Sequence, residues 1–214
     1  RSIILAELPE FEKPLVIDVY RIEADQAHQY DLPVHYSGQI IRTDFEYDVE
    51  STLRPMGEDN GYQHLWNVGS GQVEGSSLVS WLHDNSYYSL ITSATNGGKV
   101  FFTRTGANDP DFNLKSEPAL ILRLSGQNHV FASVLETHGY FNESIEASVG
   151  ARGLVESVTV VGNNEVGTVI RLQTTTGNAY HFAICNLDED KQNAAHRVEF
   201  DGVAYTWEGA FAQI

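Results

Sequence analysis

Short runs rich in Val, Ile, Thr, Tyr and Phe follow one another along almost the whole chain, with turn residues between them. Such runs are typical of β-strands, because branched and aromatic side chains pack well on a pleated sheet. The pattern predicts eleven strands, at residues 15–22, 38–47, 78–82, 87–94, 99–106, 119–126, 129–139, 154–162, 166–176, 180–187 and 196–209. Predicted turns include Asn96-Gly97-Gly98, Gly162-Asn163-Asn164 and Gly177-Asn178.

Strands in such close succession favour antiparallel pairing, and their number suits two packed sheets better than one. We therefore predict an all-β fold, an antiparallel two-sheet sandwich that forms a single domain over residues 1–214. The polar stretch from Glu46 to Gly61 is predicted to be a long loop, and it is the best candidate for an internal boundary.

The strand near residue 170 alternates between apolar and polar positions, as half-buried strands do. We expect Ile170, Leu172 and Thr174 to face inward. The alternate positions are expected to face solvent, namely Val169, Arg171, Gln173 and Thr175. The single cysteine, Cys185, lies among alternating apolar residues and is predicted to be a small buried core residue.

Charge limits the possible partners of the chain. Its 214 residues carry 29 Asp and Glu against 13 Lys and Arg, for a net charge of -16. Long-range repulsion therefore disfavours nucleic acids and anionic membranes, so an anionic ligand needs a local basic pocket. No apolar run is long enough for a membrane helix, and the first residues lack the layout of a signal peptide. One cysteine excludes an intrachain disulfide.

The eight histidines offer possible metal ligands, but none forms an i, i+2 or i, i+4 pair. We expect most of them to be hydrogen-bonded strand or loop residues, and His138, among polar neighbours in LETHGYFN, is the best exception. The residues concerned are His28, His35, His64, His83, His129, His138, His181 and His196.

A second possible metal site begins at Asp109, Asp111 and Asn113, which have the spacing that opens a calcium loop. Leu114 replaces the turn glycine and Leu120 replaces the bidentate acid, so a rigid loop capped by Asx side chains is the better interpretation. No G-x-S-x-G motif marks a nucleophilic serine.

Aromatic residues suggest sugar stacking, although in a β-sandwich most such residues fill the core. The candidates are Trp66, Trp81, Trp207, Tyr87 and Tyr88.

Five blocks of sequence carry a resemblance to a known family. They are DVYRIEADQAHQYDLPVHYSGQI, NGYQHLW, FFTRTGANDPDFNL, LETHGYFNESIE and AYTWEG, in that order, within Leu15 to Gly209. The blocks resemble the C-terminal β-sheet region of heparinase II/III-like polysaccharide lyases, most closely the oligoalginate lyases of polysaccharide lyase family 17.

The resemblance implies a parent enzyme in which an N-terminal helical toroid precedes an antiparallel β-domain, and which cleaves uronate polymers by β-elimination. That reaction needs a base for the C5 proton, an acid for the leaving O4, and groups that neutralise the carboxylate. In the family these roles belong to a tyrosine, a histidine, an asparagine and an arginine, in the toroid and the first β-domain strands. These parts would precede Arg1.

We therefore assign no catalytic residue, metal ligand or cofactor to this chain, and any metal of the parent would be held by residues outside it. The chain alone is expected to be inactive and to complete the enzyme structurally or at its cleft. The expected partners are a uronate oligosaccharide, bound through the parent enzyme, the toroid domain and a possible second copy of the chain. The resemblance also implies a bacterial protein that is periplasmic or secreted.

Two other classes of protein remain open: a carbohydrate-binding β-sandwich without turnover, and an assembly domain whose strands pair with another subunit. Under the lyase hypothesis, a patch of polar residues from two of the motif blocks is expected to face substrate. Its members are Arg104, Asn108, Asp109, Asn113 and His138.

Overall fold

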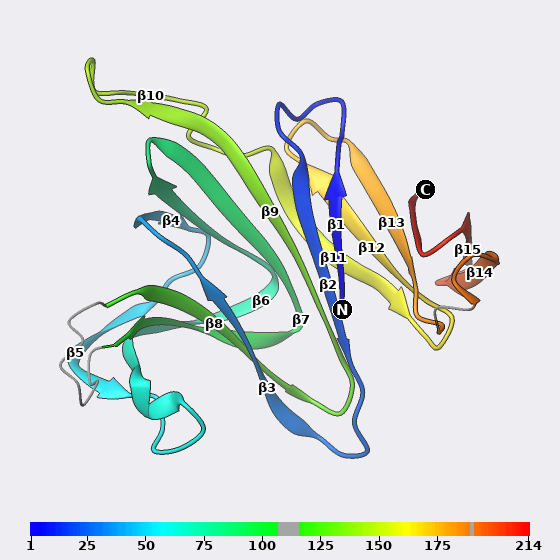
Figure 1. The fold of residues 1–214 in the computed structure, drawn as a ribbon, viewed down its shortest axis with the longest axis horizontal. Coiled ribbons are helices and arrows are strands. Elements are labelled where there is room, and N and C mark those ends of the chain that lie inside the picture. The colour runs from blue at the N-terminus through cyan, green and yellow to red at the C-terminus, as the bar shows by residue number, and fades with distance from the viewer. Residues whose placement is uncertain (107–115, 189–190) are drawn as a thin grey trace.

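The computed structural model describes residues 1–106, 116–188 and 191–214, and these residues form three antiparallel sheets (Figure 1). The largest sheet contains β1 (Ser2–Ala6), β2 (Leu15–Ile22), β3 (His28–His35), β4 (Gln39–Thr43), β5 (Asp48–Pro55), β6 (Leu65–His83), β7 (Ser86–Thr105), β8 (Pro118–Gly126), β9 (His129–Asn142) and β10 (Ala147–Val149). The second contains β11 (Val155–Asn163), β12 (Gly167–Thr174), β13 (Ala179–Cys185) and β16 (Phe211–Gln213). The third pairs β14 (Ala195–Phe200) with β15 (Val203–Glu208). The predicted all-β sandwich is confirmed.

The ten-stranded sheet combines local and distant pairings. Its main path runs β1-β2-β9-β7-β6-β4, while β8 joins β7 to β3 and both β5 and β10 pair with a neighbour in sequence. All of these pairs are antiparallel, as predicted. The strand order is only partly a meander, because β2 pairs with β9 and β3 with β8. The sheet curls into a half-barrel (Figure 1).

The two longest strands of this half-barrel, β6 and β7, form a hairpin. The two strands contain 19 and 20 residues and meet at Asp84 and Asn85, whose positive φ angles of 45° and 63° suit a tight hairpin turn. The turn predicted at Asn96-Gly97-Gly98 is wrong, because these residues lie inside β7. Gly97 has a φ of 75° beside a register shift near Gly75, so glycine supplies a bend in the strand.

Residues of β7 alternate between the two faces of the curled sheet. Ile91 belongs to the core between the sheets, whereas Leu90, Val100 and Phe102 pack inside the half-barrel. Ile91 therefore faces the second sheet, whereas Leu90, Val100 and Phe102 face the inside of the curl.

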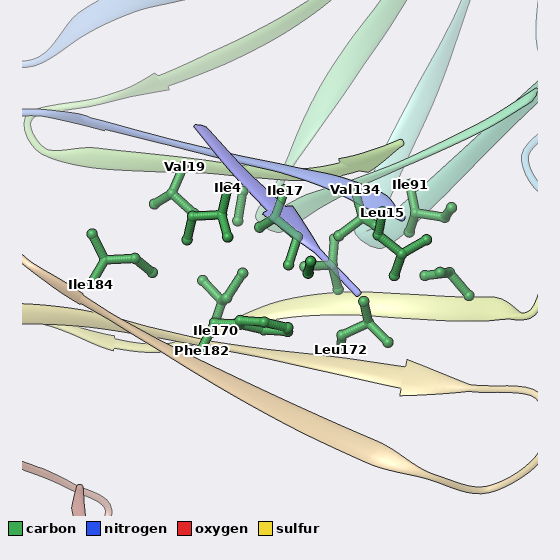
Figure 2. Packing of buried hydrophobic residues seen from close by; sticks show 14 of the residues in the cluster. Ile4, Leu15, Ile17, Val19, Ile91, Val134, Ile170, Leu172, Phe182 and Ile184 are labelled. Atoms are coloured by element: carbon green, nitrogen blue, oxygen red, sulfur yellow. The ribbon is translucent and has the colours of Figure 1, made fainter. Parts of the chain in front are cut away.

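The two main sheets pack face to face through aliphatic side chains. Figure 2 shows Ile17, Val134 and neighbouring residues of the large sheet above Ile170, Leu172 and Phe182 of the second sheet. Ile17, Ile170 and Leu172 have no exposed surface. Burial of a side chain of this size stabilises a fold by roughly 1.5–3 kcal/mol relative to exposure, so this contact organises the sandwich.

The predicted faces of β12 are confirmed, with one exception. Ile170, Leu172 and Thr174 are buried. Val169, predicted to face solvent, is also buried because it packs with Val198 and Trp207 of the β14–β15 hairpin. The hairpin thus covers the outer face of the second sheet. Cys185 lies in the same cluster, and its predicted burial in the core is confirmed.

The stretch from Glu46 to Gly61 is predicted to be a long loop. This prediction is wrong in part, because the stretch contains β5. All the residues of this strand are exposed, and its pairing with β6 is interrupted between Val49 and Arg54. The backbone hydrogen bonds of an edge strand do not require buried side chains. The polar composition of this segment therefore gives no sign of the strand in the sequence. A single 3-10 turn, η1 (Tyr62–His64), follows it.

Candidate functional site

Three members of the predicted polar patch, Asn108, Asp109 and Asn113, lie outside the described residues. The same holds for the calcium-like segment that begins at Asp109. Arg104 is exposed near the end of β7, and His138 is half-buried in β9.

The structure places Arg104 and His138 on opposite faces of the large sheet. Arg104 shares the inner face with Phe102, whereas His138 bonds Ser89, which shares its face with Ile91 of the inter-sheet core. The two described members of the patch therefore do not form one surface. Whether either of them faces substrate stays a prediction.

Arg104 lines a pocket on the inner face of the half-barrel, with a volume of about 230 Å³. Tyr36, which follows β3, and Tyr47, which precedes β5, form its aromatic walls together with Phe102. The rings of Tyr47 and Phe102 lie 4.6 Å apart between centroids. Ile40 and other apolar residues complete a lining that is largely uncharged.

Gly69 and Gly71 lie in the motif YQHLWNVGSG (residues 62–71), which overlaps the NGYQHLW block, and they allow the segment around Tyr47 to approach β6 closely. A Cβ atom at Gly71 would lie 2.4 Å from the carbonyl oxygen of Glu46, and one at Gly69 would lie 2.7 Å from that of Asp48. Contacts this short exclude any larger residue unless the backbone moves. The motif thus positions one wall of the pocket.

The electrostatics of the pocket depend on Arg104, which is the only charged residue among its described lining residues. Burial raises the pKa of Tyr36, and the positive charge of Arg104 partly opposes this rise. The phenol of Tyr36 is therefore neutral at physiological pH and can act as a hydrogen-bond donor.

The acidic residues next to Tyr47 belong to a different depression of the surface. Glu46 and Asp48 line a groove with Gln72 and Lys99, and neither carboxylate lines the Arg104 pocket. Tyr47 lines both depressions and separates the Arg104 pocket from this groove.

His138 has a local structural role on the opposite face. Its Nε2 lies 2.8 Å from the Ser89 hydroxyl, which in turn lies 2.7 Å from that of Ser80. Its Nδ1 lies 2.8 Å from the carbonyl oxygen of Gly150, which can only accept. Nδ1 therefore carries a proton and donates it, and in the neutral ring Nε2 accepts from Ser89. Both ring nitrogens are engaged.

Tyr62 of the NGYQHLW block is also held in a polar cluster. Its hydroxyl donates to Asp31 over 2.5 Å, and Arg123 donates to the same carboxylate through two nitrogens at 2.8 and 2.7 Å. The hydrogen bond to Asp31 is the main cause that raises the pKa of Tyr62, and burial adds to it. This cluster ties η1 to β3 and β8, which explains a motif residue without invoking catalysis.

The aromatic candidates for sugar stacking are mostly core residues. Trp81, Trp207 and Tyr87 are buried, and Trp81 stacks on half-buried Tyr88. The pocket tyrosines, Tyr36 and Tyr47, were missed by sequence reasoning, although both lie in the tyrosine-rich region between residues 30 and 47. Only the contact between distant strands brings them beside Arg104.

Within residues 1–106, 116–188 and 191–214, no group of three or more His, Cys, Asp or Glu side chains is arranged to hold a metal ion. The same residues include no helix with the length and apolar character needed to span a membrane.

Comparison with known proteins identifies two related enzymes, whereas no family model matches the chain. An alginate lyase of Stenotrophomonas maltophilia is 35% identical over 218 residues, and an exo-oligoalginate lyase of Saccharophagus degradans is 34% identical over 215 residues. These matches cover 100% and 98% of this chain but only 29% of each relative, so the chain spans under a third of their length. The chain is therefore related along its whole length to a region of larger alginate lyases, as its motifs predicted.

Proposed function

We propose that this chain is the C-terminal β-domain of an alginate or oligoalginate lyase that cleaves uronate glycosidic bonds by β-elimination. In this proposal the domain completes the substrate cleft and supports the fold, and the catalytic groups belong to the rest of the enzyme. The observation that carries it is the match of the whole chain to less than a third of two lyases, one named for alginate and one for oligoalginate.

The state of one adjacent tyrosine–histidine pair, Tyr87 and His138, supports a non-catalytic role for these two residues. Elimination needs side chains that can exchange protons with the substrate. Tyr87 and His138 are the right residue types and lie together, but Tyr87 is buried and its hydroxyl lies 2.6 Å from that of Ser148. Both ring nitrogens of His138 form hydrogen bonds, Nε2 with Ser89 and Nδ1 with Gly150.

The charge distribution agrees with a supporting role. At a net charge of -16, the chain as a whole repels a polyuronate, so it is a poor independent binder of alginate. The Arg104 pocket is a place where one anionic group can be held locally. We propose that Arg104 faces the substrate cleft, and that the toroid domain and a uronate oligosaccharide are the partners of this face.

We also propose that the enzyme acts outside the cytoplasm, in the periplasm or after secretion, because an alginate polymer is met there. A second copy of the chain as partner stays a prediction.

Deletion tests the proposal. A full-length enzyme that contains this region is compared with the same enzyme cut immediately before Arg1, and the ultraviolet absorbance of the unsaturated uronate is followed. We expect the cut enzyme to lose most of its activity, because the cleft is incomplete. Circular dichroism of the cut enzyme checks that its helical part remains folded. Full activity of a folded, cut enzyme would refute a cleft-completing role.

A further inference from the structure

We propose that the Arg104 pocket is a binding subsite for the carboxylate of a single uronic acid residue, with Tyr36 and Tyr47 as its aromatic walls. The inference rests on the proposed function for the class of ligand, and on the geometry of the pocket for the place and the residues.

The cation of this pocket is available to a ligand. Arg104 is exposed and has no ion pair within the described part of the chain, whereas Arg1 and Arg123 each hold an aspartate through two nitrogens. An arginine fork matches the two oxygens of a carboxylate, and such bidentate pairs are among the stronger polar contacts in proteins. Arg104 thus offers the pairing that Arg123 already uses on Asp31.

The walls of the pocket suit a sugar ring. Tyr47 lines the pocket with 42% of its surface exposed, and its ring is tilted by 51° against that of Phe102. Tyr36 is half-buried against Trp81, at 5.4 Å between ring centroids, which leaves it rigid. Amphipathic rings of this kind combine apolar contact with a hydroxyl at the edge.

The size of the pocket limits the ligand to about one sugar ring. Its volume of about 230 Å³ is below the roughly 300–1,000 Å³ of pockets that enclose drug-sized molecules. A single ring with its carboxylate on Arg104 fits this scale, and the rest of an oligosaccharide would extend out of the pocket.

The chain has a net charge of -16 and repels anions at long range, but the pocket offers an anion a local positive charge at Arg104. Glu46 and Asp48, the acidic residues next in sequence to Tyr47, line the neighbouring groove that contains Lys99. A carboxylate at Arg104 therefore meets a cation and neutral walls, with no acidic side chain among the described residues that line the site. We expect selection for a uronate over a neutral sugar.

Titration of the 214-residue chain with a saturated uronate disaccharide, followed by NMR of the backbone amides, tests the inference. We expect shifts at residues 68–69 and 102–104, around the pocket. Arg104→Gln should raise the Kd by about tenfold or more, because a charge-assisted pair is lost. Arg104→Lys should lie between the wild type and Arg104→Gln, since it keeps the charge and loses the fork.

Arg152→Gln is the matched control, because it removes the same charge at an exposed arginine that does not line the pocket. It should leave the Kd unchanged within about twofold, since distant surface charges are screened. A neutral disaccharide of the same ring size should produce no shifts at the pocket.

Equal weakening by Arg104→Gln and Arg152→Gln, or shifts confined to other surfaces, would overturn the subsite. So would the absence of any uronate-induced shift. The binding measurement does not depend on turnover. If the enzyme does not need this chain for elimination, the proposed function is wrong even if the pocket binds uronate. If the enzyme needs the chain but the pocket binds no uronate, only the subsite is wrong.

Discussion

The imidazole ring of His138 lies stacked on the phenol ring of Tyr87, with 6.0 Å between the centroids and 16° between the planes. The two residues are direct partners in the pairing of β9 with β7. Together they hold the segment that contains β10, because Tyr87 bonds Ser148 and His138 bonds Gly150. This segment extends from the end of β9 at the edge of the molecule (Figure 1).

Removal of the Tyr87 hydroxyl should loosen the β10 segment. Tyr87→Phe keeps the buried ring and loses the hydrogen bond to Ser148, so we expect a loss of about 1 kcal/mol in the free energy of unfolding. Hydrogen exchange should speed up at residues 147–149. Tyr88→Phe is the control, because the Tyr88 hydroxyl has no hydrogen bond to the described residues, and it should leave exchange in β10 unchanged. Equal effects of both variants would contradict this role.

Glu136 should be among the residues most sensitive to substitution. Its buried carboxylate accepts the backbone N–H groups of Leu154 and Val155 at 2.7 and 2.9 Å, which links β9 to the start of β11. Glu136→Gln places an amide donor against one of these donors, and we expect it to cost about 2–3 kcal/mol in urea unfolding.

Glu156→Gln serves as the comparison for Glu136→Gln, since it makes the same chemical change at an exposed position of β11. It should change the free energy of unfolding by less than about 0.5 kcal/mol. Similar losses in the two variants would show that Glu136 is not a special link.

Gly71 should tolerate no side chain. Because a Cβ would lie 2.4 Å from the Glu46 carbonyl oxygen, Gly71→Ala must displace the segment before β5, at a cost of roughly 1–3 kcal/mol. Thermal unfolding measures the loss. At Gly126 the nearest atom would lie 3.8 Å from the new Cβ, so Gly126→Ala should be close to neutral. An unchanged melting temperature for Gly71→Ala would contradict the close approach.

Stability should fall on acidification through pH 6.5. Burial lowers the pKa of His129 from its ordinary value of 6.5, and its Nε2 is buried without a partner within the described part of the chain. Below pH 6.5 the unfolded chain therefore binds a proton that the folded chain does not, and stability decreases until the pH passes the folded pKa. Burial, aided by Arg171, lowers the pKa of His181 in the same direction.

Urea unfolding between pH 7 and pH 5 measures this dependence. His129→Phe, which retains an aromatic contact to Phe131, should flatten the decline, whereas substitution of the exposed His64 by Gln should not. A slope that His129→Phe leaves unchanged would exclude His129 as a source of the pH dependence.

Local patterns in the sequence predicted the strands well where one face is buried. The alternation in β12 identified Ile170 and Leu172 as inward-facing because period two follows directly from strand geometry. The burial of Val169 was not predicted, because the residues that bury it belong to the β14–β15 hairpin, far along the chain. The pairing of β2 with β9 likewise depends on distant segments that no local pattern links.

The errors have physical causes. Asn96-Gly97-Gly98 has turn composition, but the conformational freedom of Gly97 is used for a bend within β7. In the candidate site, sequence reasoning selected Arg104 from its motif and could not find Tyr36 or Tyr47. These tyrosines join Arg104 only through the curl of the sheet and the close approach at Gly71.

Whether the β-domain is required but non-catalytic is tested most directly by incubation of this chain with oligoalginate while the ultraviolet absorbance of unsaturated uronate is recorded. The chain is assayed alone and after mixing with the separately prepared remainder of the enzyme. We expect no product from the chain alone and turnover from the mixture. Turnover by the chain alone would contradict a non-catalytic role, because the catalytic groups would then lie within these 214 residues.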